Sequence, residues 1–342
     1  MAWIKNIALL IGSIFVTLVI LEIGLRAFPV TDVSRTKPLA LDSSPLEVSS
    51  QPNEILSYSR EWNFKNARQR KTNNLGFFSD YDYKPGKEGV FVVGDSFVEA
   101  AQVDFDQTFH QLLANELDAE IYNFGVSGSP LSQYQAYVED LCRRFKPSTV
   151  VIPIIANDFN QSMRSNARRA GFFHYDDTGA LNPTPYVISN IRSAANASAL
   201  ARYAYFHLGI GNLIRSGLSD VGSAVSKESA DKDFSIHKMA ADYFLDHMSN
   251  TCLARDEILF VVDANRSESG IYKEGNRVPY MKYFIDSAER RGFRVVDLTP
   301  IMMKEFKKNG IRFEFPFDGH WDAAGHALVA KAVAAELSVT SR

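Results

Sequence analysis

Residues 90–98 read VFVVGDSFV, an uncharged apolar run that ends in glycine, aspartate and serine. Such a run is typical of a strand that is buried on both faces of a parallel sheet. Serine after Gly-Asp is common in turns, so Ser96 is either the cap of a following helix or a reactive hydroxyl at the end of a strand. The rest of the chain has to decide between these two interpretations.

Strand and helix patterns alternate on both sides of this run. Apolar runs predict further strands, and residues with helical spacing predict helices between and after them. Strands separated by helices need crossover connections, so we expect an α/β fold with a mostly parallel sheet and helices on both faces. The further strands are expected at residues 120–124, 149–155, 257–262 and 293–298, and the helices at 108–117, 132–145, 236–250, 279–291 and 323–337.

The N-terminal segment differs from the rest of the chain. Residues 7–21, IALLIGSIFVTLVIL, carry no charge but are short for a full span. With residues 2–4 and 23–25 included, the stretch is long enough to span a bilayer if Lys5 and Glu22 lie near the interfaces. No A-x-A cleavage site follows, so residues 1–29 are expected to form an uncleaved signal anchor rather than a core helix. Lys5 favours a cytoplasmic N-terminus and an extracytoplasmic body, on the periplasmic or outer face, whereas Arg26 counts against this orientation.

The body of the chain is expected to follow a linker. Residues 30–65 are rich in Ser, Pro and Thr and predict a tether, and residues 66–342 predict the catalytic domain. Within that domain, residues 161–233 break the α/β rhythm and predict an inserted cap region over one end of the sheet. The cap is expected to include a hairpin in FFHYDDTGALNPTPY, residues 172–186.

Composition and cysteine spacing exclude several classes of protein. The chain has 342 residues and a net charge of −3, which gives no reason to expect a nucleic-acid partner. Cys142 and Cys252 have neither CxxC nor metal-ligand spacing, so no metal site or cofactor is expected. Pairing of the two in an oxidising compartment is possible in principle, but we expect two separate buried thiols.

Polar clusters follow three of the expected strands, at residues 94–96, 123–128 and 157–158. Because binding groups in open parallel sheets gather beyond the carboxyl ends of the strands, this coincidence favours a reactive Ser96. A histidine base is then needed, and FPFDGHWDAAGH near the C-terminus offers one. In an extended loop Asp318 and His320 project from the same side, so the acid is placed to fix the imidazole tautomer. His326, within the last helix, is expected to pack or cap.

Four short motifs, VVGDSFV, NFGVSGS, AND and DGHW, resemble in this order the motif blocks of the SGNH (GDSL-type) hydrolase superfamily, over residues 70–160 and 255–337. The resemblance implies a three-layer, flavodoxin-like fold. It implies Ser96 as nucleophile, His320 as general base and Asp318 as the acid that orients it. Donors to the oxyanion would be the N–H groups of Ser96 and Gly128 and the side-chain amide of Asn157. Many members have Asp and His three apart; the two-residue spacing here is similar to that of polysaccharide-modifying relatives.

The function expected from this resemblance is that of a serine esterase. It would hydrolyse an acyl ester, such as an O-acetyl group on a cell-envelope carbohydrate, through an acyl-Ser96 intermediate. Its partners would be an acylated small molecule or carbohydrate, and a membrane through the N-terminal helix. Two alternatives stay open: an O-acyltransferase that uses the same intermediate, and a catalytically silent scaffold in envelope polysaccharide assembly.

Overall fold

The computed structural model describes residues 2–34, 37–167, 170–210, 227–264, 278–316 and 319–340. The chain divides into two compact units. The first comprises Met1–Thr36, Ile55–Arg70 and Ile188–Ala224 and is called here the anchor unit. The second comprises Lys37–Glu54, Lys71–Val187 and Val225–Arg342 and is called the sheet unit.

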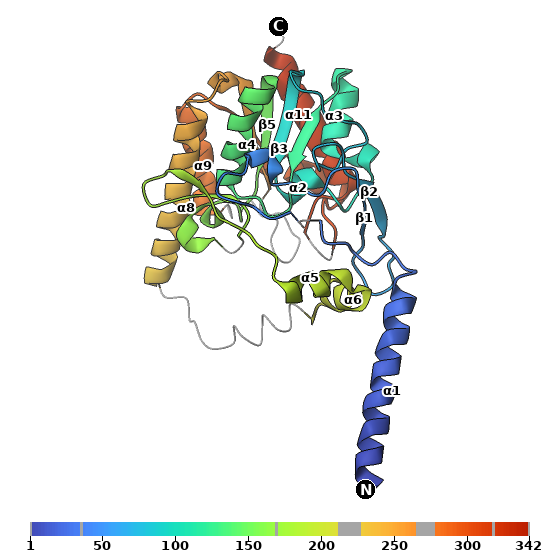
Figure 1. The fold of residues 1–342 in the computed structure, drawn as a ribbon. Helices are drawn as coiled ribbons and strands as arrows, with labels where there is room; N and C mark the ends of the chain where they lie inside the picture. Colours follow the sequence, from blue (N-terminus) through green and yellow to red (C-terminus); the bar gives the residue numbers. More distant parts are fainter. Residues whose placement is uncertain are drawn as a thin grey trace. The chain divides into compact units, whose positions relative to one another are not determined.

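A five-stranded parallel sheet forms the centre of the sheet unit (Figure 1). Its spatial order is β4-β3-β5-β8-β9, which, counted along the chain, is the 2-1-3-4-5 order of flavodoxin-like folds. The strand residues are mostly apolar because helices cover both faces of the sheet. The strands are β3 (Glu88–Gly94), β4 (Tyr122–Gly125), β5 (Lys146–Ile154), β8 (Ile258–Val262) and β9 (Arg294–Asp297).

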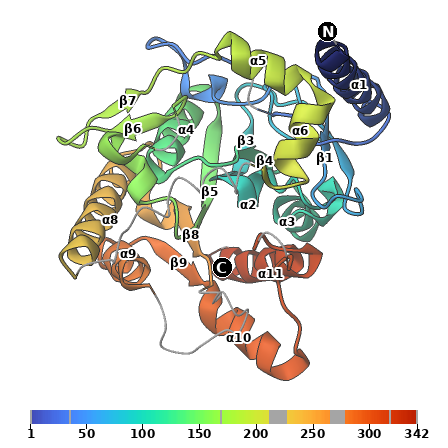
Figure 2. The ribbon, with the colours of Figure 1, turned by 90° about the horizontal axis from the view of Figure 1, so that it is seen from below.

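Alternate residues of each strand enter two separate hydrophobic cores, one on each face of the sheet. Val92 and Val151 belong to one core, and Val93 and Ile152 belong to the other. The helices α3, α10 and α11 cover the first face, and α4, α8 and α9 cover the second (Figure 2). The six helices are α3 (Phe109–Leu117), α4 (Leu131–Arg144), α8 (Lys227–Met248), α9 (Pro279–Arg290), α10 (Leu298–Asn309) and α11 (Ala323–Thr340).

The predicted α/β fold with a mostly parallel sheet is therefore confirmed. One helix, α10, was not predicted, because its first residue, Leu298, continues the apolar pattern of β9 and Pro300 follows in its first turn. Proline is tolerated in the first turn of a helix, and the Asp297 side chain caps this end by accepting a hydrogen bond from the Thr299 amide at 3.0 Å.

Two cysteines that we expected to be separate buried thiols form a disulfide. Cys142 lies in α4 and Cys252 lies in the loop between α8 and β8, and their sulfur atoms are bonded at 2.05 Å. Cys252 is exposed and Cys142 is only partly buried, so neither is an enclosed thiol. The prediction was wrong because 110 residues separate the pair, and only the fold brings the two close.

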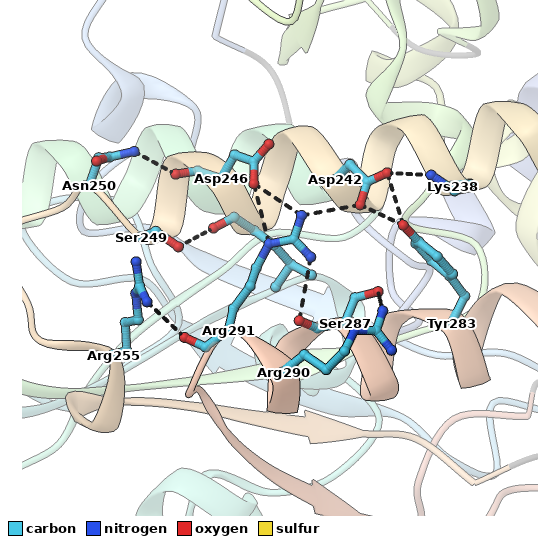
Figure 3. Close-up of polar contacts among 11 residues, drawn as sticks. Lys238, Asp242, Asp246, Ser249, Asn250, Arg255, Tyr283, Ser287, Arg290 and Arg291 are labelled. Carbon is cyan, nitrogen blue, oxygen red and sulfur yellow. Dashed lines mark hydrogen bonds and ion pairs between the residues drawn. The ribbon is translucent and has the colours of Figure 1, made fainter.

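A polar network joins α8 to α9 on the outer side of the sheet unit (Figure 3). The Tyr283 hydroxyl and the Lys238 ammonium both donate to Asp242, and Arg291 donates to Asp242 and Asp246. Burial alone would raise the pKa of Asp242, but the hydrogen bonds from Lys238 and Tyr283 outweigh burial and lower it. The network fixes how the two helices lie along each other.

The anchor unit contains α1 (Ala2–Leu25), β1 (Ile55–Tyr58), β2 (Arg68–Lys71, which extends one residue beyond it), α5 (Asn190–Ala197) and α6 (Ala199–Phe206). Residues Trp3–Leu25 of α1 are long and apolar enough to cross a membrane and are unburied. The side chain of Glu22 accepts hydrogen bonds from the Ser198 hydroxyl and the Leu200 amide, both at 2.8 Å. These contacts join the last turn of α1 to the beginning of α6.

The segments expected as tether and inserted cap are divided between the two units. Leu39, Leu46 and Val48 are buried in the core of the sheet unit, although the Ser- and Pro-rich composition around them predicted a tether. Of the insertion, residues up to Val187 belong to the sheet unit and Ile188–Ala224 to the anchor unit. The predicted hairpin is present as β6 (Phe173–Tyr175) and β7 (Leu181–Pro183).

Short 3₁₀ helices complete the secondary structure of the described residues. They span Pro45–Glu47, Phe105–Gln107, Asn160–Ser162, Arg164–Asn166 and Arg255–Glu257.

Candidate active site

Ser96 stands where β3 turns sharply into the short helix α2 (Ser96–Glu99). Asp95 caps this helix by accepting a hydrogen bond from the Phe97 amide at 2.9 Å. Gly94 permits the turn, because a Cβ atom there would lie 2.4 Å from the Val98 side chain. The turn leaves the Ser96 side chain only partly buried, at the carboxyl end of a central strand, so the capping role belongs to Asp95.

His320 comes from the opposite end of the sequence and lies against Ser96. Its Nε2 atom is 2.8 Å from Ser96 Oγ, across a sequence separation of 224 residues. Asp95 Oδ2 lies 3.3 Å from the same hydroxyl. The hydroxyl carries one proton, and the shorter separation favours Nε2 as its acceptor. This is the contact that a hydroxyl nucleophile and an imidazole base require.

Aromatic packing and one buried hydrogen bond hold the His320 loop in place. The ring of Phe97 packs against the His320 ring at 4.8 Å and against Trp321 at 4.9 Å. The fully buried Trp321 donates its indole N–H to Asp263 Oδ1 at 2.9 Å. Sequence reasoning missed Trp321 and Asp263 as supports. A tryptophan directly after the histidine, and an acid directly after the β8 strand, were the available signals.

The strands beside β3 bring two further strand ends to the same edge of the sheet. Gly94 of β3 pairs with Gly125 of β4, three residues before Gly128. Val92 of β3 pairs with Val151 of β5, and Asn157 follows the end of that strand in an exposed turn. Gly128 and Asn157 therefore lie at the strand ends that flank Ser96, as the sequence predicted, and their roles stay predictions.

Two glycines in the loop after β4 are required for different reasons. Gly128 has a φ of +82°, which favours glycine. Gly125 lies so close to α2 that a Cβ atom would be 2.3 Å from the Glu99 amide nitrogen. The carboxylate of Glu99 also accepts a hydrogen bond from the Ser127 amide at 2.5 Å. Helix α2 therefore fixes both Ser96 and the loop that carries Gly128.

Two buried carboxyl groups, those of Asp95 and Asp158, adjoin the strand ends that form the site. Burial raises the pKa of Asp95 to about 6, although the hydrogen bond from Phe97 and the nearby His320 act in the opposite direction. Burial and the nearby Asp95 also raise the pKa of Asp158 well above its usual value. Asp158 accepts a hydrogen bond from the Ile155 amide at 2.8 Å and so shapes the turn beside Asn157.

Two residues named in the sequence analysis remain to be located, Asp318 and His326. Asp318, the expected partner of His320, lies outside the described residues, between Pro316 and Gly319. His326 lies in α11, where its Nδ1 accepts a hydrogen bond from the Phe109 amide at 3.2 Å and caps α3, so the prediction that it packs or caps is confirmed. Among the described residues, no group of three or more His, Cys, Asp and Glu side chains is arranged to hold a metal ion.

Comparison with known proteins gives one family. Residues 90–333 match the family described as GDSL-like lipase/acylhydrolase. No curated protein matches the chain. A solved member of the lipolytic protein G-D-S-L family from Veillonella parvula is similar in structure, with 10% identity and a TM-score of 0.41 over 75% of this chain and 99% of its own. A carbohydrate esterase family 2 enzyme with a carbohydrate binding domain, from Corynascus thermopiles (Myceliophthora fergusii), shares 16% identity and a TM-score of 0.40, over 80% and 72%.

Proposed function

Because the chain belongs to the GDSL-like lipase/acylhydrolase family and is an ester hydrolase of SGNH type, we propose that Ser96 is its nucleophile and His320 its general base. The observation that carries this proposal is the 2.8 Å separation between Ser96 Oγ and His320 Nε2. A serine hydroxyl is a weak nucleophile until a neighbouring base takes its proton, and neutral imidazole does so near pH 7. An intact pair of this kind counts against a silent scaffold.

The reaction follows from this pair in two steps. Ser96 Oγ attacks the ester carbonyl while its proton passes to His320 Nε2, and the imidazolium then returns that proton to the leaving alcohol. Water attacks the acyl-Ser96 ester with His320 again as base, which releases the acid and restores Ser96. The N–H groups of Ser96 and Gly128 and the side chain of Asn157 are the proposed donors to the oxyanion. Loss of one such donor costs roughly 10²–10³-fold in turnover. Asp318 is proposed to orient the imidazole.

The proposed substrate is an O-acetyl group on a cell-envelope carbohydrate. Three observations support this choice. The apolar helix α1 would tether the enzyme to a membrane, the Cys142–Cys252 disulfide fits an oxidising compartment outside the cytoplasm, and the two-residue Asp318–His320 spacing is similar to that of polysaccharide-modifying relatives. A tethered enzyme on that side of the membrane reaches polymers of the envelope. The substrate is tested by incubating acetylated and deacetylated envelope glycans with the enzyme and comparing the mass of each glycan before and after incubation.

Acyl transfer is the second fate of the same intermediate, and it differs from hydrolysis only in the acceptor. If a sugar hydroxyl replaces water, the acyl group appears on an added glycan instead of as free acetate. Quantifying both products in one reaction decides between the two. Acetate release that is unaffected by added glycan supports hydrolysis, whereas acetylated glycan at the expense of acetate makes the protein a transferase.

Substitutions of Ser96 and two histidines test the catalytic pair. Ser96→Ala and His320→Ala should each lower turnover of p-nitrophenyl acetate by about 10⁴-fold or more. His326→Ala is the matched control, since it removes a buried cap on α3 and should lower the melting temperature while most turnover remains. A fluorophosphonate probe should label wild type and His326→Ala but not Ser96→Ala. Wild-type turnover in Ser96→Ala, or equal losses at both histidines, would contradict the assignment.

A further inference from the structure

The anchor unit exposes large apolar side chains near the C-terminal end of α1. Single exposed apolar residues are common on protein surfaces. A group of them beside one end of α1, in addition to those of α1 itself, indicates a surface that contacts a partner. The clearest case is α5, an eight-residue helix with no buried residue, in which Ile191 is 86% exposed. The group, called here the collar, comprises Phe28, Trp62, Ile191, Tyr205, Leu208 and Ile210, each at least 40% exposed.

Ring contacts join the collar to the residues that directly follow α1. Phe28 stacks on Phe64 with ring centroids 5.4 Å apart, and Phe64 packs against Tyr203 of α6 at 5.5 Å. The Tyr203 hydroxyl donates to the Trp62 carbonyl oxygen at 2.9 Å. Segments that are distant in the sequence are therefore held together next to the helix end.

Polar contacts set the level of the collar along α1. Glu22, in the last turn, accepts hydrogen bonds from Ser198 and Leu200 at the beginning of α6. Arg26, just beyond the helix, donates to the carbonyl oxygen of Ala197 at the end of α5, at 3.4 Å. Both views place α6 beside this end of α1 (Figure 1, Figure 2). The collar thus lies where the apolar stretch of Trp3–Leu25 ends, which is the level of a bilayer surface.

Charge is distributed very unevenly between the two units. The sequence of the anchor unit holds ten Lys and Arg against four Asp and Glu, a surplus of six positive charges, of which Lys5 lies at the far end of α1 and the others do not. The chain as a whole carries −3, so the sheet unit carries −9. Lys65, Arg192 and Arg26, which also pairs with Glu22 at 2.8 Å, are among the exposed basic residues of the anchor unit. A basic surface with exposed aromatic and aliphatic side chains matches the headgroup region of an anionic bilayer.

We propose that the collar rests in the headgroup region of an anionic phospholipid bilayer, the one that α1 spans. This inference rests on the membrane attachment proposed above, but it holds for either orientation of α1. The apolar side chains of the collar enter the boundary between headgroups and acyl chains, and the basic side chains meet the lipid phosphates. The anchor unit is then a surface-bound base rather than a free tether.

Trp62 reports directly on this contact. The chain has three tryptophans, and in a Trp3→Phe variant only Trp62, which is 69% exposed, and the fully buried Trp321 emit. The full-length variant is reconstituted in phosphatidylglycerol–phosphatidylcholine vesicles that contain phosphatidylcholine brominated near the headgroup end of its chains. Roughly half of the emission should be quenched. The matched control, Trp3→Phe with Trp62→Phe, keeps only Trp321 and should be quenched little.

Further variants test the other parts of the proposal. Ile191→Glu combined with Leu208→Glu should lower Trp62 quenching at least twofold, whereas Leu41→Glu with Ile311→Glu, two exposed apolar residues of the sheet unit, should not. Replacing phosphatidylglycerol by phosphatidylcholine should weaken quenching. Hydrolysis of p-nitrophenyl acetate by each variant shows that it has folded.

The outcomes distinguish failure of the collar from failure of the anchor. If sodium carbonate extracts the protein from the vesicles, the membrane attachment itself is wrong. If the protein stays in the pellet and Trp62 is quenched no more than the control, the collar proposal is overturned while the anchor stands. If Trp62 is instead shielded from acrylamide in detergent, in proportion to protein concentration, the collar binds a second copy of the chain and the lipid proposal is also overturned.

Discussion

Asp95 combines two roles that oppose each other energetically. Its carboxyl oxygen caps α2 and so fixes the position of Ser96, and its charge lies near the imidazole of His320. Burial of that charge is unfavourable and raises the pKa of Asp95 to about 6, from a usual 3.8. In the proposed mechanism, a negative charge near His320 favours the imidazolium that forms when His320 takes the proton of Ser96. We infer that stability is lost here in return for stabilisation of the transition state.

Asp95→Asn tests this balance through its dependence on pH. The amide keeps an oxygen for the Phe97 amide and removes the buried charge. Because the folded pKa is raised, the wild-type carboxyl costs nothing below about pH 4 and costs the full amount above about pH 6. The variant should therefore match wild type near pH 4 and gain about 2–3 kcal/mol over it at pH 8, measured as unfolding by urea.

The activity of the same variant should change in the other direction. Turnover of p-nitrophenyl acetate at pH 8 should fall by about tenfold, the equivalent of one pKa unit of charge stabilisation. If the difference in unfolding free energy between the variant and wild type is the same at pH 4 and pH 8, Asp95 is not buried as a charge. Unchanged turnover would show that its field does not assist His320.

At the scale of elements, the short helix α2 organises two parts of the site. Its first residue is Ser96, and its last, the buried Glu99, holds the loop after β4 through the Ser127 amide. The loop also packs on the α2 backbone at Gly125. A displacement of α2 therefore moves the proposed nucleophile and the proposed Gly128 donor together, which keeps their spacing constant.

Glu99 is accordingly predicted to be a positioning residue. Glu99→Ala should lower kcat by roughly 10²-fold with little change in KM, because a displaced oxyanion donor weakens the transition state more than substrate binding. Glu99→Gln keeps an acceptor oxygen and should restore most of kcat. If the glutamine variant is as impaired as the alanine variant, the hydrogen bond to Ser127 is not what matters.

The disulfide connects α4 to the loop after α8 and closes a long segment of chain. Replacing both Cys142 and Cys252 by alanine should lower the free energy of unfolding by about 2–5 kcal/mol, since the bond restricts the unfolded chain across 110 residues. Urea unfolding with and without dithiothreitol measures this. Reductant should destabilise wild type by a similar amount and leave the stability of the variant unchanged. If reductant does not change the stability of wild type, the disulfide is not formed.

For the whole molecule, the proposed membrane attachment raises the question of which side of the membrane holds the sheet unit. Lys5 lies on one side of the apolar stretch and Arg26 on the other, so the charges next to α1 do not decide the orientation. The disulfide does favour one side, because such bonds persist outside the cytoplasm. The expected arrangement is a cytoplasmic N-terminus and an extracytoplasmic sheet unit.

Protease treatment of spheroplasts tests this arrangement. A tag at the C-terminus of the full chain should be digested without lysis, and the protein should stay with the membrane after carbonate washing. A cytoplasmic protein serves as the lysis control. A tag that is digested only after lysis would place the sheet unit in the cytoplasm, where structural disulfides do not persist.

Much of the sheet unit was predictable, because its strands are apolar runs that end at polar clusters. The pairing of Ser96 with a histidine near the C-terminus was predictable for the same reason, from the strand-end rule and the DGHW motif. Trp321 as a support of the site was not, since its indole partner Asp263 lies 58 residues away. Nor was the burial of Leu39, Leu46 and Val48, because the Ser- and Pro-rich segment around them shows no periodicity even where these side chains enter a core.

The cysteine pair also bears on how the chain matures. With two cysteines in the whole sequence, one intramolecular pairing exists, and no wrong partner competes within the chain. In the proposed extracytoplasmic location, the chain therefore needs an oxidant once Cys252 has crossed the membrane, but no isomerase to reshuffle bonds. Expression in a host that lacks periplasmic disulfide isomerase should leave the stability of this protein unchanged. Loss of the thiol oxidase should instead leave a less stable, reduced enzyme.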